Sequence, residues 1–255
     1  MSGMTLNENR TQAPVFRLAG LTAAISGAPV MKSTGRDYRV RGVSRPDITI
    51  DVSAYARLLQ DKNPGLEWEI CCYTASARQF YVRLLPFEGF VLHACAVVLD
   101  GGAYLFSADS GTGKSTHAAL WLSHFGKSRA YILNDDKPLI RKQDGKYLAY
   151  GAPWCGSAGL GVNKSAPIKG VAFLTRDETD WIRPLSNREA LPHLLRQSDP
   201  LVRVEQMGAL VSLLGDFLQS VPAYLMGCTI SENAVSIAHG AMAGKGGTDG
   251  WHLMA

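Results

Sequence analysis

The most informative part of the sequence is an octapeptide, Ala108-Asp109-Ser110-Gly111-Thr112-Gly113-Lys114-Ser115. It fits the phosphate-loop pattern, with Ala at the first glycine position and the final Gly-Lys-Ser intact. An apolar run at 103–107 precedes it, and a segment with helical spacing, 114–125, follows it and stops at Gly126. In this strand–loop–helix context, backbone amides of the loop and of the helix N-terminus can point together at phosphate oxygens.

Each polar residue of this loop has an expected role toward ATP and Mg²⁺. Lys114 is expected to reach the β- and γ-phosphates, the Ser115 hydroxyl to ligate Mg²⁺, and Thr116 to support the following turn. The other residues predicted to bind ATP are Asp109, Ser110, Gly111, Thr112 and Gly113. The competing interpretation, a Gly/Ser-rich turn that happens to precede a helix, is disfavoured by the flanking strand and helix.

A pair of adjacent carboxylates follows the next predicted strand. Asn134-Asp135-Asp136 ends the apolar run 131–133, one helix after the loop. Two carboxylates there can divide two tasks, one beside a metal ion and the other beside a hydroxyl group that receives phosphate. The alternative for this triplet is a turn and helix cap without chemistry.

His93 lies in the apolar run 90–99, on a predicted strand that precedes the loop strand. The dipeptide Asp100-Gly101 between this run and 103–107 is a hairpin signal, so the two strands are expected to be adjacent. A lone histidine in such a run is more often a satisfied core residue than a catalyst.

Taken together and in this order, His93, the loop and Asp135-Asp136 resemble the HPr kinase/phosphorylase family, which is itself similar to ATP-dependent phosphoenolpyruvate carboxykinases. The resemblance covers roughly residues 90–183. It implies a P-loop kinase core with a mixed sheet, with Asp136 as the base toward the acceptor hydroxyl. It also implies that Asp135, as a metal ligand, and His93 hold the metal, water and γ-phosphate region, beside Lys114.

One segment departs from that family. Bacterial HPr kinases carry a metal-binding Glu in an ExRGxG-type segment, whereas residues 151–161 here read GAPWCGSAGLG and contain no carboxylate. The departure argues against HPr as the acceptor. The chain is more similar to the small branch that includes kinases of a serine in ribosomal peptide precursors, such as lasso peptides. The hexameric assembly of HPr kinases is for the same reason a poor guide, and a homo-oligomer stays an open expectation.

The rest of the chain suggests an α/β protein with an appended β-rich part. We expect a flexible N-terminus at 1–14, a small β-rich region at 15–86, the kinase-like domain at 87–239 and a flexible tail at 240–255. A helix is predicted at 74–85 with Thr74 as its N-cap. Further helices are predicted at 188–197, 202–219 and 231–241, and their apolar stripes are assigned to packing alone.

Composition narrows the function classes. The formal charge of +4 comes from scattered Lys and Arg, so no nucleic-acid partner is expected. No apolar stretch is long enough to cross a bilayer, the N-terminus lacks a signal-peptide pattern, and five cysteines show no CxxC pair. We therefore expect a cytoplasmic protein without a membrane partner.

Several further choices stay open from the sequence. Trp154 is assigned to packing more readily than to substrate stacking, and Lys164 to solvated surface. Arg176 or Arg183 could clamp the transferred phosphoryl group. The expected acceptor is a peptide or protein. The alternatives are a kinase of a small-molecule hydroxyl, such as a free amino acid or sugar, and a non-catalytic ATP-binding module.

Overall fold

The computed structural model describes residues 13–198 and 204–244. They fall into two compact units, residues 1–76 and 77–255, that divide within one helix. The predicted flexible ends lie largely outside the described residues, at 1–12 and 245–255. Residues 240–242, which the predicted tail includes, form the last turn of a helix instead. The domain ranges drawn from the sequence stay a prediction.

The first unit holds a four-stranded sheet in the order β3-β1-β2-β4. Its strands are β1 (Val15–Leu18), β2 (Leu21–Ser26), β3 (Arg39–Val40) and β4 (Ile48–Asp51). β1 and β2 form a tight hairpin in which Ala19 and Gly20 both have positive φ, at 51° and 77°. Two 3₁₀ turns, η1 (Pro29–Lys32) and η2 (Arg36–Tyr38), lead into β3. The small β-rich N-terminal part expected from the sequence is thus present.

Two helices follow this sheet. α1 (Ser53–Lys62) has no counterpart among the predicted elements, and α2 (Trp68–Leu84) begins six residues before the predicted start at Thr74. Thr74 therefore lies inside α2 and is not its N-cap. The earlier turns are helical because Cys71, Cys72 and Ala75 extend the buried face that α2 presents. Pro86 belongs to a 3₁₀ turn, η3 (Leu85–Phe87), directly after α2.

The second unit is built on a nine-stranded mixed sheet with the main path β5-β9-β10-β11-β7-β6-β8. The strands are β5 (Gly89–Val91), β6 (Ala94–Leu99), β7 (Gly102–Ser107), β8 (Ala130–Asn134), β9 (Leu139–Gln143), β10 (Lys146–Tyr150), β11 (Ser165–Arg176), β12 (Trp181–Pro184) and β13 (Ala223–Cys228). The long strand β11 joins the parts, because its first residues pair with β10 and its later ones pair with both β7 and β13.

The predicted hairpin is confirmed by β6 and β7, which pair antiparallel across Asp100 and Gly101, both with positive φ. The apolar run 90–99 is not one strand, however. It breaks at Leu92 and His93, so β5 pairs with β9 while β6 pairs with β7 and β8. His93 therefore lies in the bend between two strands and not on a strand.

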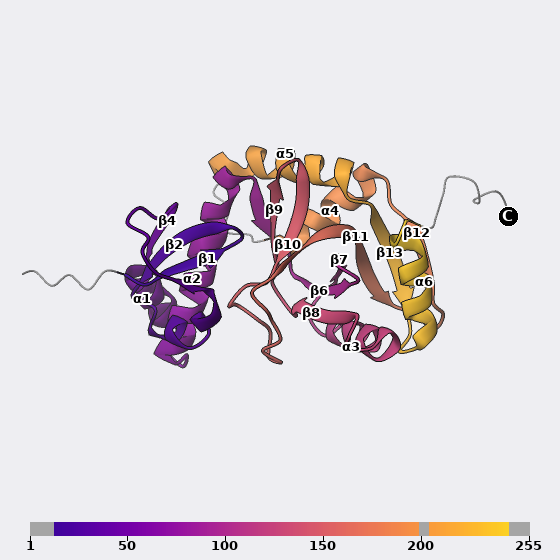
Figure 1. Ribbon diagram of the computed structural model, residues 1–255, viewed down its shortest axis with the longest axis horizontal. Helices are drawn as coiled ribbons and strands as arrows, with labels where there is room; N and C mark the ends of the chain where they lie inside the picture. Colours follow the sequence, from indigo (N-terminus) through magenta and orange to yellow (C-terminus); the bar gives the residue numbers. More distant parts are fainter. Residues whose placement is uncertain (1–12, 199–203, 245–255) are drawn as a thin grey trace, which may run out of the picture. The chain divides into compact units, whose positions relative to one another are not determined.

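Helices cover both faces of this sheet, as Figure 1 shows for α3 and α5 on opposite sides. They are α3 (Lys114–Phe125), α4 (Asn187–Gln197), α5 (Val204–Ser220) and α6 (Glu232–Met242). α4 and α5 bury Leu194, Leu214 and Phe217 in one core cluster. α3 and α6 bury Trp121 and Val235 in a second cluster on the other face. No helix in the described part of the chain is long and apolar enough to cross a membrane.

The topology brings several chain segments to one edge of the sheet. β7 runs parallel to β11, and β11 runs parallel to β13, so their carboxyl ends lie together. β6 is antiparallel to both β7 and β8, which places the start of β6 and the end of β8 at that same edge. The loop after β7, the residues after β8 and the bend at His93 therefore converge there.

Candidate functional site

The loop from Ala108 to Gly113 connects β7 directly to α3. Gly111 and Gly113 have φ of 79° and 119°, a backbone conformation that strains any residue with a side chain. α3 begins at Lys114 without a side-chain cap, so the amides of its first turn have no partner from an N-cap residue. Free amides and the positive end of the helix dipole make this end of α3 suited to an anion.

Lys114 is folded back onto its own loop. Its Nζ donates to the carbonyl oxygens of Ala108 at 2.8 Å and Asp109 at 3.3 Å. The residue is buried, and desolvation lowers the pKa of its ammonium group despite the nearby carboxylate of Asp136. The ammonium is thus held close to the N-terminus of α3, where an incoming anion would gain from its charge.

In the turn after β8, the three consecutive residues Asn134, Asp135 and Asp136 have different contacts. The Asn134 side-chain oxygen accepts from the amides of Asp136 at 3.0 Å and Lys137 at 2.6 Å, so Asn134 forms the turn. Asp135 is buried, and its two carboxylate oxygens accept from the amides of Gly156 at 2.7 Å and Leu160 at 3.3 Å. The turn interpretation therefore holds for Asn134, while Asp135 fixes the loop 156–160.

Asp136 faces His93. Its Oδ1 lies 3.2 Å from His93 Nε2, and the two side chains are 32% and 22% exposed. The hydrogen bond from His93 lowers the pKa of Asp136 below the usual carboxyl range, with burial acting against it. On the other side of the ring, His93 Nδ1 lies 3.0 Å from the side-chain oxygen of Gln197. His93 is therefore a polar link between two side chains and not a residue of the apolar core.

These groups line one hollow of about 450 Å³ at the N-terminus of α3. Its lining includes His93, Ser110, Gly111, Gly113, Lys114, Ser115, Thr116, Asp135, Asp136 and residues 156–158. Most of the predicted site residues are thus together. Asp109 and Thr112 are the exceptions, because they line neighbouring hollows instead.

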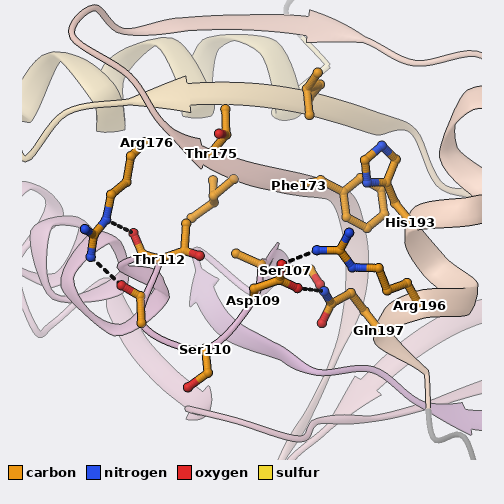
Figure 2. Close-up of a pocket in the computed structure, with 14 residues that line it drawn as sticks. Ser107, Asp109, Ser110, Thr112, Phe173, Thr175, Arg176, His193, Arg196 and Gln197 are labelled. Atoms are coloured by element: carbon orange, nitrogen blue, oxygen red, sulfur yellow. Dashed lines mark hydrogen bonds and ion pairs between the residues drawn. The ribbon is translucent and has the colours of Figure 1, made fainter.

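Asp109 turns away from this hollow. Its carboxylate forms an ion pair with Arg196 and accepts from Gln197 Nε2 at 2.8 Å, as Figure 2 shows. The hydrogen bond from Gln197 lowers the pKa of Asp109, and the charge of Arg196 adds to the effect. Neither partner was singled out from the sequence, because both lie at the end of an amphipathic helix where nothing but proximity in the fold connects them to the loop.

The two candidate arginines differ in position. Arg176, at the end of β11, donates through its guanidinium to the carbonyl oxygens of Thr112 at 3.3 Å and Gly111 at 2.5 Å (Figure 2). Arg183 lies on β12 and forms an ion pair with Glu189 at 3.0 Å. Of the two, Arg176 is the one in contact with the loop.

Two more hollows adjoin the loop on the Arg176 side. One, of about 670 Å³ and drawn in Figure 2, is lined by Asp109, Phe173, Arg176, His193 and Arg196, among others. The second, of about 450 Å³, runs beside α3. It is lined by loop residues together with Thr116, His117, Leu120, Arg176, Asp177, Cys228, Thr229 and Ile230.

Two other residues considered from the sequence have plain structural surroundings. Trp154 is 2% exposed, with its ring centroid 5.4 Å from that of Phe80 and 5.5 Å from that of Tyr81. Lys164 is exposed, and its Nζ lies 4.9 Å from the centre of the Tyr131 ring. These positions favour packing for Trp154 and a surface role for Lys164.

Comparisons with known proteins give a family match and distant structural likenesses. No curated protein matches the chain. The HPr(Ser) kinase/phosphatase from Coxiella burnetii is a similar solved structure, at 14% sequence identity and a TM-score of 0.34. The alignment covers 61% of this chain and 95% of that chain. The family model described as "SynChlorMet cassette protein ScmC" matches residues 63–234, which is more than half of the chain, and the protein therefore belongs to the ScmC family.

Proposed function

We propose that this protein is an ATP-dependent kinase that transfers the γ-phosphate to a hydroxyl group, most simply a serine of a peptide or protein such as a ribosomal peptide precursor. One observation carries the proposal: Lys114, the N-terminus of α3 and the carboxylate of Asp136 line a single hollow. An anion site beside an ionised carboxylate combines a place for the phosphates with a group that can accept the proton of a hydroxyl, as phosphoryl transfer uses them.

In this proposal the loop and α3 bind the phosphates. The amides of Gly113 and of the first turn of α3 would face phosphate oxygens, and Lys114 would exchange the carbonyls of Ala108 and Asp109 for the β- and γ-phosphates. That exchange favours binding, because Lys114 gains ionic partners in place of neutral ones.

The nucleoside has a candidate place next to the phosphate hollow. The hollow beside α3 shares the lining residues Gly111, Gly113 and Thr116 with it, so the two adjoin at the helix N-terminus. Leu120 and Ile230, which is 79% exposed, offer apolar surface there, and Arg176 offers a planar cation. A base lying between them would leave the γ-phosphate toward Asp136.

The donor set of the phosphate hollow fits Mg²⁺. Among the described residues, no group of three or more His, Cys, Asp or Glu side chains is arranged to hold a metal ion. Mg²⁺ in phosphate sites keeps several waters and needs few protein ligands, and the Ser115 hydroxyl with an Asp135 oxygen suffices for that mode. When bound, the ion would neutralise charge on the phosphate oxygens.

Asp136 is the proposed base toward the acceptor. Its lowered pKa keeps it ionised near neutral pH, and His93 fixes the orientation of its carboxylate. Asp136 would accept the hydroxyl proton while the loop and Lys114 hold the phosphates in place. Positioning and charge neutralisation would supply most of the rate enhancement.

A non-catalytic ATP-binding module is a second candidate, and one feature favours it. Both carboxylate oxygens of Asp135 already accept backbone amides of the segment 156–160, and the sequence there lacks the acidic residue expected from the resemblance to HPr kinases. A small-molecule hydroxyl remains the alternative acceptor for an active enzyme.

Transfer of label from γ-phosphate-labelled ATP to a cell extract and to a peptide library tests the proposal, with Lys114→Ala as the inactive control and Lys127→Ala, in the turn after α3, as the matched one. Label on a peptide or protein that is absent only with Lys114→Ala supports the proposal. Label on a small molecule changes the acceptor class, and ATP binding without any transfer supports the binding module.

A further inference from the structure

The last two residues of α4 contact the candidate site, although the sequence pattern assigns this helix to packing alone. Gln197 donates from its side-chain nitrogen to Asp109 Oδ1 at 2.8 Å, and its side-chain oxygen lies 3.0 Å from His93 Nδ1. Arg196 forms an ion pair with the same carboxylate of Asp109. A continuous polar chain therefore runs from Arg196 through Asp109, Gln197 and His93 to Asp136.

The hydrogen-bonding capacity of each group fixes the direction of this chain. The Asp109 carboxylate can only accept, so the amide nitrogen of Gln197 must face it. The amide oxygen of Gln197 is left to face His93, and an oxygen can only accept, so Nδ1 of His93 carries a proton. The ionised carboxylate of Asp136 also can only accept, so Nε2, 3.2 Å from its Oδ1, donates to it, and in this chain both ring nitrogens of His93 carry a proton.

The backbone around Gln197 holds this arrangement in place. The amide of His93 donates to the carbonyl oxygen of Gln197 at 2.8 Å, and Leu92 forms an isolated β-bridge with Ser198. α4 itself is anchored by a capping box between Ser186 and Glu189 and by buried Leu194. Gln197 thus meets His93 through both its main chain and its side chain, which makes the contact a fixed one.

We propose that Gln197 is a positioning residue: it fixes the ring orientation of His93 by accepting from Nδ1–H, so that Nε2–H donates to Asp136, and Asp109 in turn fixes the amide of Gln197. The role of this chain in turnover rests on the proposed kinase function, whereas its effect on His93 does not. Asp109 acts from within the phosphate loop, so the loop and the histidine are linked through the end of α4.

The presence of a proton on each ring nitrogen of His93 is directly measurable by ¹H–¹⁵N long-range correlation NMR of the ¹⁵N-labelled full chain, with signals assigned by their loss in His93→Gln. We expect a protonated Nδ1 in the unaltered protein. In Gln197→Leu, Nδ1 loses its acceptor while Asp136 still accepts at Nε2, so the ring shifts to the Nε2–H tautomer. Gln219→Leu, on the exposed side of α5, is the matched control and leaves the His93 signals unchanged.

A double substitution tests the direction of the chain. Gln197→Glu alone places two carboxylates against each other and breaks the link to Asp109. Adding Asp109→Asn lets the new amide donate to Glu at position 197, which still accepts from His93 Nδ1. The double variant is expected to recover the Nδ1–H signature that Gln197→Leu has lost, although it changes two residues and not one.

Turnover gives a second readout, measured as consumption of γ-labelled ATP with Mg²⁺ and cell extract. We expect kcat to fall about tenfold or more in Gln197→Leu, with KM for ATP within about twofold, because residues that orient a site group typically act on that scale. An Nδ1 of His93 that remains protonated in Gln197→Leu overturns the proposal, whatever the turnover. If no protein in the set binds or consumes ATP while the tautomer shifts as described, the kinase proposal fails and the positioning of His93 by Gln197 stands.

Discussion

Replacing Asp136 by Asn removes the proposed base while preserving the shape of the site. The amide oxygen of Asn can still accept from His93 Nε2, which lies 3.2 Å from Asp136 Oδ1, and the side chain is 32% exposed. Asn134, which forms the turn, accepts from the main-chain amide of residue 136 and is not affected by the change. The free energy of unfolding should therefore change by less than about 1 kcal/mol, as for partly exposed isosteric substitutions.

The effect on turnover follows from the pKa of Asp136. A positioned base contributes roughly 10²- to 10⁴-fold, and most when its pKa is near the working pH. The hydrogen bond from His93 lowers the pKa of Asp136 below the usual carboxyl range, so the lower part of that interval applies. We expect kcat to fall by about 10²- to 10³-fold, which corresponds to about 2.7–4.1 kcal/mol of barrier.

The assay measures label transfer from ATP and, separately, ATP binding by calorimetry. Asp144→Asn is the matched control, because Asp144 is exposed in the tight β9–β10 turn, where Asn before Gly145 is equally acceptable. Unaltered turnover in Asp136→Asn would refute the role as base. An equal loss of ATP binding and turnover would instead assign Asp136 to binding.

Two further predictions concern stability near the site. Burial raises the pKa of Asp180, but hydrogen bonds from Ser231, Thr229 and Asn233 outweigh it and lower the pKa to about 2. The stabilisation is therefore present above pH 4 and is lost as the pH falls through about 2. After discounting for solvent screening, Asp180→Asn should lower the free energy of unfolding by about 1 kcal/mol at pH 7, measured with urea, and a gap from the unaltered protein that is as large at pH 2 as at pH 7 would contradict this. Trp154→Ala should lower the free energy of unfolding by about 3–5 kcal/mol, because the Trp154 side chain is 2% exposed and packs against Phe80 and Tyr81. If Trp154 instead stacks on substrate, the substitution would change KM with little loss of stability.

The sequence predicted the elements that carry strong local signals. The hairpin at Asp100-Gly101 and the helix end at Gly126 were predicted correctly. The backbone at these positions has positive φ, a conformation that favours the residue types found there. α1 was missed, since it has a single fully buried residue, Ala56, and so lacks an apolar stripe. The run 90–99 was misjudged as one strand because periodicity cannot show that its two halves pair with different partners.

Candidate site residues could be identified from the sequence where they are neighbours along the chain, as in the loop 108–115 and the Asp135-Asp136 pair after β8. The sequence could not show which role belongs to Asp135 and which to Asp136, because these roles depend on which carboxylate accepts from the amides of Gly156 and Leu160. Likewise, the choice between Arg176 and Arg183 depends on the register of β11 against β7, which brings the end of β11 to the loop.

The polar chain at the end of α4 could not be predicted from the sequence, because its residues come together only in the fold. Asp109 and Gln197 are 88 residues apart, and Gln197 and His93 are 104 apart, so no local pattern connects them. Their hydrogen bonds require that Nδ1 of His93 donate to Gln197, which orients the ring so that Nε2 donates to Asp136. The proposed base is thus oriented through a residue that its own strand and loop do not supply, and a site with the same loop but without Gln197 would leave Nδ1 of His93 without this acceptor.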